Sequence, residues 1–555
     1  MIDSNALYYG DNLDILRNSL ADQSVDLVYL DPPFNSARSY NLIFATPKGI
    51  ASDAQITAFE DSWHWGDQSE REFDQILGQP NTLVSEMVVS FRRFLGENDM
   101  MAYLTMMANR LLELHRVMKP TASIYLHCDP TASHYLKIIM DGVFGKDNYR
   151  NEISWLRSQP KSQASVNFSN CRDIILRYSK SDLVVFNKIY GQHDEGYIKK
   201  FYKYTDEDGR RYMLDNLANP NPDRPNLTYK FLGVTRVWCW TKDRMKKAYE
   251  EGRVVQLKPG SVPRLKRYLD ESKGKPITNN WTDIEHLHGS NHEFLGYPTQ
   301  KPLALLERII LASSNEGDVI LDPFCGCGTA VHAAHRLGRK WIGIDITHLA
   351  VSLIEKRLKD SFEDIQFIVK GTPTDEAGAR DLANRDKYQF QWWACSLVNA
   401  QPYQGKKKGA DSGIDGIIYF MDEPKTHKKI VVSVKGGDNV GVAMVRDFAH
   451  VIAREEAEIG LFITLAKPTK QMISEAATLG FYKSPTTGAS FPKMQILVIE
   501  TLMTGQQVAQ FPDLSRGAST FRNSKREEVK IIQRKLFVNA DDQAEEDGDD
   551  QDEMT

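Results

Sequence analysis

The 555-residue sequence lacks several features that would place it in a specialised class of protein. No apolar run approaches the ~18 residues that cross a membrane, and the first five residues lack the basic-then-apolar order of a secretory signal. Its six cysteines are scattered, and the only close pair, Cys325 and Cys327, does not have the spacing of a metal site. We therefore expect a soluble, cytoplasmic protein with no membrane partner and no structural metal.

The sequence also lacks the excess of positive charge that is typical of nucleic-acid-binding proteins. It has 69 Lys and Arg residues against 74 Asp and Glu residues, a net charge of −5. The charge is unevenly distributed, because residues 541–553 contain nine acidic residues and no basic one, whereas residues 151–285 contain 25 basic and 17 acidic residues. The total charge therefore does not exclude DNA as a partner, since an acidic end offsets a basic middle.

Apolar strands alternate with helical stretches in two parts of the chain. Residues 24–30 and 123–129 are expected strands on either side of a helix near 100–118, and the same alternation resumes after residue 299. Such alternation predicts an α/β fold with a parallel sheet. A second, shorter α/β pattern covers residues 387–503, and the chain after residue 511 is polar and charged, so we expect disorder at its acidic end.

A glycine-rich turn at residues 322–329, Asp-Pro-Phe-Cys-Gly-Cys-Gly-Thr, follows an apolar strand and precedes a helix. Glycines in such a turn let the backbone approach a ligand, and the helix start offers free N–H groups. Asp345 ends the next strand, where a carboxylate can hold a ribose diol. A dinucleotide site is the alternative, but the spacing is not Gly-x-Gly-x-x-Gly and Asp322 would repel a phosphate. The turn favours a cationic nucleoside cofactor that carries an amino group.

A second motif, Asp31-Pro32-Pro33-Phe34, ends the strand at residues 24–30. Neither proline has an N–H, so the segment is a rigid rim of carboxylate and carbonyl acceptors beside an aromatic ring. An exocyclic amine on a flat base needs two acceptors for its two N–H groups and a ring on which to stack. The alternative interpretation is an ordinary loop at the end of a strand.

Together the two motifs resemble those of the DNA amino-methyltransferases that use S-adenosylmethionine. The catalytic-type motif precedes the cofactor-type motif by about 290 residues, an order similar to that of the β group, which includes the modification subunits of type III restriction systems. Two further segments, residues 9–12 (Tyr-Gly-Asp-Asn) and 299–302 (Thr-Gln-Lys-Pro), match other motifs of the family. The resemblance implies a Rossmann-like methyltransferase fold, with helices on both faces of a parallel sheet and an inserted target-recognition region.

The resemblance also implies a role for each motif residue. The catalytic residues would be Asp31, Pro32, Pro33 and Phe34, with Asp31 and the Pro32 carbonyl accepting from the target amine and Phe34 stacking on a flipped base. The cofactor-binding residues would be Asp11, Lys301, Asp322, Phe324, Gly326, Gly328, Thr329 and Asp345. Among them Asp345 would hold the ribose, Lys301 the carboxylate, Asp322 the ammonium side and Asp11 the adenosine end. An Asp in the first motif favours adenine N6 as the target, with cytosine N4 as the alternative.

The middle segment carries target recognition in the β group, and its net charge of +8 suits contacts with the phosphates of double-stranded DNA. We therefore expect domains at residues 1–150 (catalytic half), 151–290 (target recognition), 291–372 (cofactor-binding half), 387–505 (nuclease-like) and 506–555 (polar segment with the acidic tail). Two alternatives stay open for the assembly: a homodimer, or a complex with a partner subunit of a restriction system.

The second α/β pattern resembles the restriction-endonuclease fold of the Mrr type, on the strength of Asp415, Ser433 and Lys435. In that family an acid, then an acid or Gln, and then Lys bind Mg²⁺ and water, so Ser433 is a departure. Because Mg²⁺ depends on carboxylates, three alternatives stay open: a working nuclease that uses Mg²⁺, a module that binds DNA or a partner without cutting, and an unrelated α/β fold.

Overall fold

The computed structural model describes residues 5–33, 38–45, 51–61, 64–128, 130–159, 168–288, 291, 293–295, 297, 299–403, 413–516, 520 and 524–529. Phe34 and the acidic tail, for which we made predictions above, lie outside these residues. The chain divides into two compact units, Met1–Asn187 with Asn279–Thr555 and Lys188–Thr278. Within the described residues, no helix is both long and apolar enough to cross a membrane.

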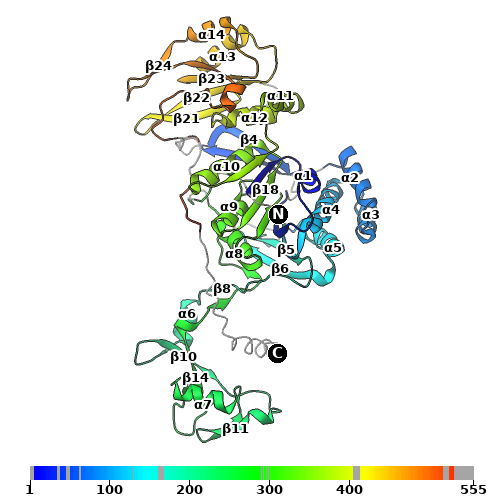
Figure 1. The fold of residues 1–555 in the computed structure, drawn as a ribbon, viewed down its shortest axis with the longest axis vertical. Helices are drawn as coiled ribbons and strands as arrows, with labels where there is room; N and C mark the ends of the chain where they lie inside the picture. The colour runs from blue at the N-terminus through cyan, green and yellow to red at the C-terminus, as the bar shows by residue number, and fades with distance from the viewer. Residues whose placement is uncertain are drawn as a thin grey trace. The chain divides into compact units, whose positions relative to one another are not determined.

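The larger unit is built on a nine-stranded sheet with the order β16-β6-β7-β5-β2-β17-β18-β1-β19 (Figure 1). Its strands are β1 (Asn5–Tyr9), β2 (Val25–Leu30), β5 (Met118–Cys128), β6 (Tyr149–Leu156), β7 (Arg172–Ser179), β16 (Asn280–Trp281), β17 (Val319–Asp322), β18 (Lys340–Asp345) and β19 (Phe367–Lys370). The run from β5 to β19 pairs in parallel, whereas β7 is antiparallel to β5 and to β6. Strand β2 therefore pairs directly with β17, although almost 290 residues separate them in the chain.

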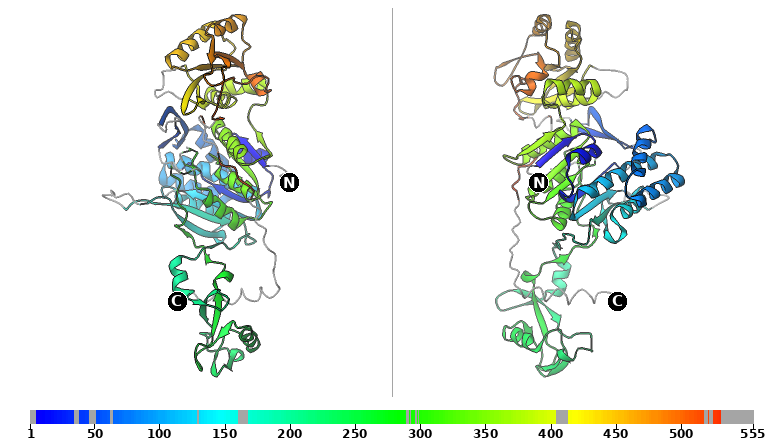
Figure 2. Two further views of the ribbon diagram at one scale, coloured as in Figure 1. Left: turned by 90° about the vertical axis from the view of Figure 1, so that its left-hand side faces the viewer. Right: turned by 45° about the vertical axis from the view of Figure 1, so that its right-hand side comes forward.

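Helices cover both faces of this sheet, with α2–α5 on one side and α8–α10 on the other (Figure 2). The helices are α1 (Asn12–Ser19), α2 (Asp67–Leu77), α3 (Thr82–Leu95), α4 (Asp99–Val117), α5 (Ser133–Phe144), α8 (Leu303–Ser313), α9 (Thr329–Arg336) and α10 (His348–Ser361). All six residues of β2 are buried, and α4 packs against them in one apolar core that contains Leu30, Leu111 and Ile342. The predicted α/β fold of the methyltransferase type is confirmed.

The smaller unit, Lys188–Thr278, consists of short strands and two helices around a core that contains Trp238 and Met245. Its elements are β8 (Tyr190–Gly191), α6 (Glu195–Phe201), β9 (Tyr204–Thr205), β10 (Arg211–Asn216), β11 (Thr228–Phe231), β12 (Val234–Val237), α7 (Lys242–Glu250), β13 (Val254–Val255), β14 (Arg264–Tyr268) and β15 (Lys275–Pro276). This unit is narrower than the predicted region 151–290. The difference arises because β6, β7 and β16 pair within the main sheet.

The second α/β region, which belongs to the larger unit, has a five-stranded sheet of order β20-β21-β22-β23-β26. Its elements are α11 (Glu376–Arg385), α12 (Lys387–Ser396), β20 (Gln401–Pro402), β21 (Gly416–Glu423), β22 (Thr426–Lys435), α13 (Val442–Arg454), β23 (Ile459–Thr464), α14 (Lys470–Ala477), β24 (Phe481–Lys483), β25 (Ser490–Pro492), β26 (Met494–Val498) and α15 (Ile499–Met503). In addition to this sheet, β3 (Arg38–Ala45) and β4 (Ala51–Asp61) form a two-stranded sheet of their own.

This region extends beyond the predicted range 387–505 at both ends. Helix α11 packs Leu382 into the core of the region, although its sequence resembles a linker. At the other end Phe511 packs against that core, and the Thr520 hydroxyl both accepts from the Tyr419 N–H and donates to its carbonyl. Residues on both sides of the predicted range therefore belong to the folded region.

Candidate functional site

A cavity of about 250 Å³ lies in the larger unit, where β2, β17 and β18 end and α1 begins. Ligands of open α/β sheets bind at this edge, outside the carboxyl ends of the strands. The cavity is lined by most of the residues that the two motifs single out: Asp11, Asp31, Pro32, Pro33, Lys301, Asp322, Phe324, Gly326, Thr329 and Asp345. The pairing of β2 with β17 thus brings the two motifs to one place.

The Asp31 carboxylate lies directly after β2 and forms an ion pair with Lys301, with 2.5 Å between Nζ and Oδ2. The two side chains are only 16% and 10% exposed, so the pair is largely shielded from water. Lys301 precedes helix α8, 270 residues further along the chain. The sequence predicts that Lys301 meets the carboxylate of a cofactor, and in the structure its ammonium group donates to Asp31.

Two glycines shape the turn between β17 and α9. Gly326 and Gly328 have φ angles of +49° and +75°, which side chains other than glycine rarely adopt. A Cβ atom on Gly326 would lie 3.2 Å from the Tyr297 ring, and one on Gly328 would lie 2.7 Å from Ile354. Gly326 lines the cavity, whereas Gly328 is the N-cap of α9.

Two carboxylates line the same cavity, the buried Asp322 and the half-buried Asp345. Asp345 accepts hydrogen bonds of 2.9 Å from the Gly326 N–H and from both the N–H and the hydroxyl of Thr347. Burial raises the pKa of Asp345 to about 6, and burial also raises the pKa of Asp322 well above its usual range. Neither carboxylate forms an ion pair within the described part of the chain, so this wall favours a ligand that brings positive charge and hydroxyl groups.

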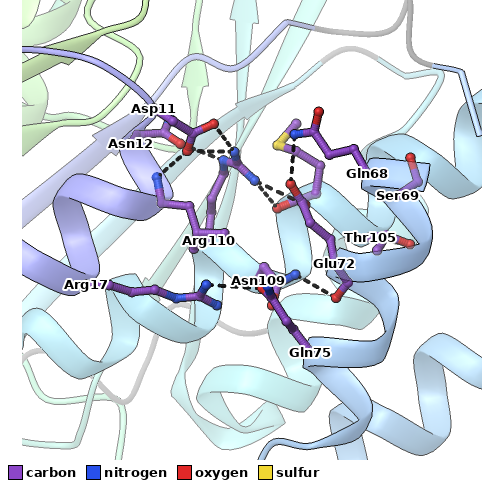
Figure 3. A network of polar contacts seen from close by, with 12 residues as sticks. Asp11, Asn12, Arg17, Gln68, Ser69, Glu72, Gln75, Thr105, Asn109 and Arg110 are labelled. Carbon is purple, nitrogen blue, oxygen red and sulfur yellow. Dashed lines mark hydrogen bonds and ion pairs between the residues drawn. The ribbon is translucent and has the colours of Figure 1, made fainter. Parts of the chain in front are cut away.

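The sequence did not single out a buried arginine beside the cavity. Arg110, in α4, bonds both carboxylate oxygens of Asp11, the N-cap residue of α1 (Figure 3). Arg110 lies in the middle of a predicted helix, and no motif marks it. Only the packing of α4 against α1 brings it to the site.

A second unpredicted feature is a buried chain of hydrogen bonds next to Asp31. The Tyr29 hydroxyl lies 3.1 Å from Nδ1 of His127, and Nε2 of His127 lies 3.0 Å from the Asp173 carboxylate. Tyr29 lines the cavity, and His127 and Asp173 are almost completely buried. These contacts join β2, β5 and β7, so they hold the strand that positions Asp31.

The nuclease-like residues also come together, at the start of β21 and the end of β22. Oδ2 of Asp415 accepts from the Val434 N–H at 2.6 Å and lies 3.5 Å from the Ser433 hydroxyl, with Lys435 ending the strand. The three motif positions supply one carboxylate, one hydroxyl and one ammonium group, a donor set that binds Mg²⁺ less well than one with a second carboxylate. Across the described residues, no three side chains of His, Cys, Asp or Glu are grouped to hold a metal ion.

Comparisons with known proteins agree with this arrangement. The family model for DNA methylases matches residues 25–356, and that for a restriction endonuclease (Mrr type) matches residues 382–480. The chain is 28% identical to the type II methyltransferase M.EcaI of Enterobacter cloacae over 64% of this chain and 69% of that protein. It is 27% identical to the Mod subunit of the type III restriction-modification enzyme StyLTI of Salmonella typhimurium over 60% of this chain and half of that protein.

Among solved structures, the complex of M1.HpyAVI with SAM aligns with 64% of this chain and 98% of its own, at 14% identity and a TM-score of 0.30. The match to the methylase family covers more than half of the chain and includes both Asp31 and the turn at residues 322–329. The restriction-endonuclease match covers Asp415, Ser433 and Lys435. This chain therefore belongs to the DNA methylase family, and it carries a restriction-endonuclease-like domain of the Mrr type in its C-terminal part.

Proposed function

We propose that this chain transfers a methyl group from S-adenosylmethionine to the N6 amine of an adenine flipped out of duplex DNA. The observation that carries the proposal is the single cavity that Asp31 shares with Asp322 and Asp345. One edge of the cavity presents acceptors for an amine, and the other presents the two carboxylates for a cationic nucleoside. A methyl acceptor and a methyl donor would thus meet between two neighbouring strands.

The residues of the cavity fit S-adenosylmethionine. Asp345 would accept from the ribose hydroxyls, Asp322 would face the ammonium group, and Asp11 would lie at the adenosine end. When bound, this cofactor supplies a methyl group on a positively charged sulfur. The two carboxylates, without an ion pair of their own in the described residues, would compensate this positive charge.

The acceptor edge would orient the target amine. The Asp31 carboxylate and the Pro32 carbonyl would each accept one N–H, which turns the nitrogen lone pair toward the methyl group. Because the methyl group is already activated, alignment is the main contribution that the protein must make. Phe34, which lies outside the described residues, would stack on the flipped base.

A transfer assay with tritiated S-adenosylmethionine and duplex DNA tests the proposal. Digestion of the product to nucleosides should place the label on N6-methyldeoxyadenosine. Label on N4-methyldeoxycytidine would overturn the choice of adenine, since both amines need the same two acceptors. Absence of transfer to DNAs of many sequences would overturn methylation altogether. Methylome sequencing of a host that expresses the chain would then give the recognition sequence.

The pH dependence of cofactor binding is a first prediction. Because the pKa of Asp345 is about 6, its carboxylate is ionised at pH 7.5 and becomes protonated as the pH falls through 6. A protonated carboxyl accepts hydroxyl donors less well, so cofactor affinity should be full above pH 7. Below pH 6 the affinity should decrease with falling pH, and the decrease should approach about tenfold per pH unit. Calorimetric titration from pH 5 to 8 measures this.

The matched control is Asp345→Asn, which should bind more weakly at pH 7.5 and lose the fall in affinity that Asp345 causes. Asp322→Asn identifies the part of the pH dependence that comes from the second carboxylate. An affinity of the unaltered chain that stays constant between pH 7.5 and pH 5 would contradict the role of Asp345.

The nuclease-like domain supplies a second prediction. Because its three motif residues lack a second strong oxygen ligand, the full chain with Mg²⁺ should leave unmethylated plasmid DNA intact. Gel electrophoresis measures this, with a commercial restriction enzyme as the positive control. Fragments that disappear with Asp415→Ala would instead establish the alternative, a bifunctional enzyme that also cleaves DNA.

A further inference from the structure

Arg110 donates hydrogen bonds to four neighbouring residues within the protein. Its side chain is 5% exposed, at the side of the cavity where α1, α2 and α4 meet (Figure 3). The Nε–H donates to Oδ1 of Asn12 (2.5 Å), one terminal nitrogen donates to Glu72 (3.4 Å) and to the Met106 carbonyl (3.1 Å), and the other donates to the two oxygens of Asp11 (3.1 and 3.0 Å). All three nitrogen atoms of the guanidinium group therefore contact acceptors of the protein.

These contacts indicate how Arg110 acts. Each nitrogen of the guanidinium group is engaged with the protein, so Arg110 is placed to act through the residues that it holds. Three of these, Asp11, Asn12 and Met106, line the cavity themselves, whereas Glu72 does not. Glu72 supplies a second carboxylate to the guanidinium, so the charge of Arg110 is shared between Glu72 and Asp11.

The residues that Arg110 holds belong to both parts of the cofactor site. Asp11 caps α1 by accepting from the Leu13 N–H at 2.7 Å, which positions the turn before that helix. The Asn12 side-chain amide donates to the Pro323 carbonyl at 2.8 Å, across 311 residues of sequence. Pro323 lies in the turn at residues 322–329. One guanidinium group thus joins the turn before α1 to the turn after β17.

We infer that Arg110 of α4 is a positioning residue of the cofactor site, and that Glu72 of α2 helps to hold it in place. The inference rests on the proposed binding of S-adenosylmethionine. Lysine could not replace Arg110, because an ammonium group has a single nitrogen, whereas three nitrogen atoms of Arg110 contact Asn12, Glu72 and Asp11 separately.

A purely structural role is the competing explanation, since removing one partner of a buried charge pair destabilises a fold. The two roles differ in kinetics. A structural defect lowers the fraction of folded enzyme and the melting temperature, and it leaves the KM of the folded fraction unchanged. A positioning defect raises the KM and Kd for the cofactor in protein that is folded, while kcat at saturating cofactor changes little.

The test compares Arg110→Lys, Glu72→Gln and Arg17→Lys in the full chain. Arg17 is a matched control, because it bonds Gln75 of α2 at 3.1 Å in the same network but does not line the cavity (Figure 3). We expect Arg110→Lys to raise the calorimetric Kd for S-adenosylmethionine about 10- to 100-fold. Glu72→Gln should raise it a few-fold, and Arg17→Lys should leave it within twofold, with kcat of all three within about threefold.

Two outcomes would overturn the inference: an unchanged Kd in folded Arg110→Lys, or a lower melting temperature with unchanged KM. If Arg110→Lys does not fold, Glu72→Gln decides, since it keeps the arginine and removes only one charge; an unchanged Kd then overturns it. Failure of the unaltered chain to bind S-adenosylmethionine would be a failure of the proposed function, and it is seen before any variant is made.

Discussion

Replacing Asp31 with alanine is expected to reduce methyl transfer by at least about a hundredfold, while S-adenosylmethionine binds with nearly its original Kd. The carboxylate is the charged acceptor at the end of β2, and it would orient the target amine rather than hold the cofactor. Without it, the Pro32 carbonyl would be the remaining proposed acceptor for the amine. Tritium transfer to DNA and calorimetric titration of the cofactor, on the same preparation, measure the two quantities.

Asp31→Asn sharpens this test because it keeps the size of the side chain and removes its charge. We expect it to transfer more than Asp31→Ala but still far less than the unaltered chain. Asp22→Asn is the control, since Asp22 is an exposed carboxylate that pairs with Arg116 and does not line the cavity. Either substantial transfer by Asp31→Ala or loss of its cofactor binding would contradict the assignment of Asp31 to the amine.

Replacing Lys301 with methionine should lower kcat about a hundredfold, because it leaves the Asp31 carboxylate largely buried without its cation. Steady-state kinetics at saturating DNA measure kcat and the KM for the cofactor separately.

Two roles of Lys301 give opposite kinetic results. Contact with the carboxylate of the cofactor, which the sequence alone suggests, predicts a raised KM with little change in kcat. Pairing with Asp31 predicts the reverse. Lys119→Met is a matched control, because Lys119 pairs with Asp26 of the same strand β2, at 2.7 Å, but does not line the cavity. A raised KM alone in Lys301→Met would show that the observed pair with Asp31 does not govern the reaction.

The sequence by itself indicated the chemistry of the site. Asp31-Pro-Pro-Phe and residues 322–329 are local motifs, and their residue types alone suggest an acceptor for an amine and a turn that binds a cofactor. It also indicated the α/β class, because periodicity of apolar residues is local. The matches to known families then confirmed the resemblance of both regions. The sequence did not indicate that β6 and β7 belong to the main sheet, because this membership depends on strand pairing that a local pattern does not contain.

Only the tertiary structure decided which residues meet. The pairing of β2 with β17 places Asp31 and Asp322 in one cavity, the start of α8 brings Lys301 to Asp31, and the packing of α4 brings Arg110 to Asp11. Each of these contacts spans at least 99 residues of sequence. Composition and local sequence pattern do not predict contacts between residues that lie so far apart in the chain, because strand order and helix packing are set by burial of the whole core. The motifs thus indicate the chemistry, whereas long-range packing determines which groups each charged side chain contacts.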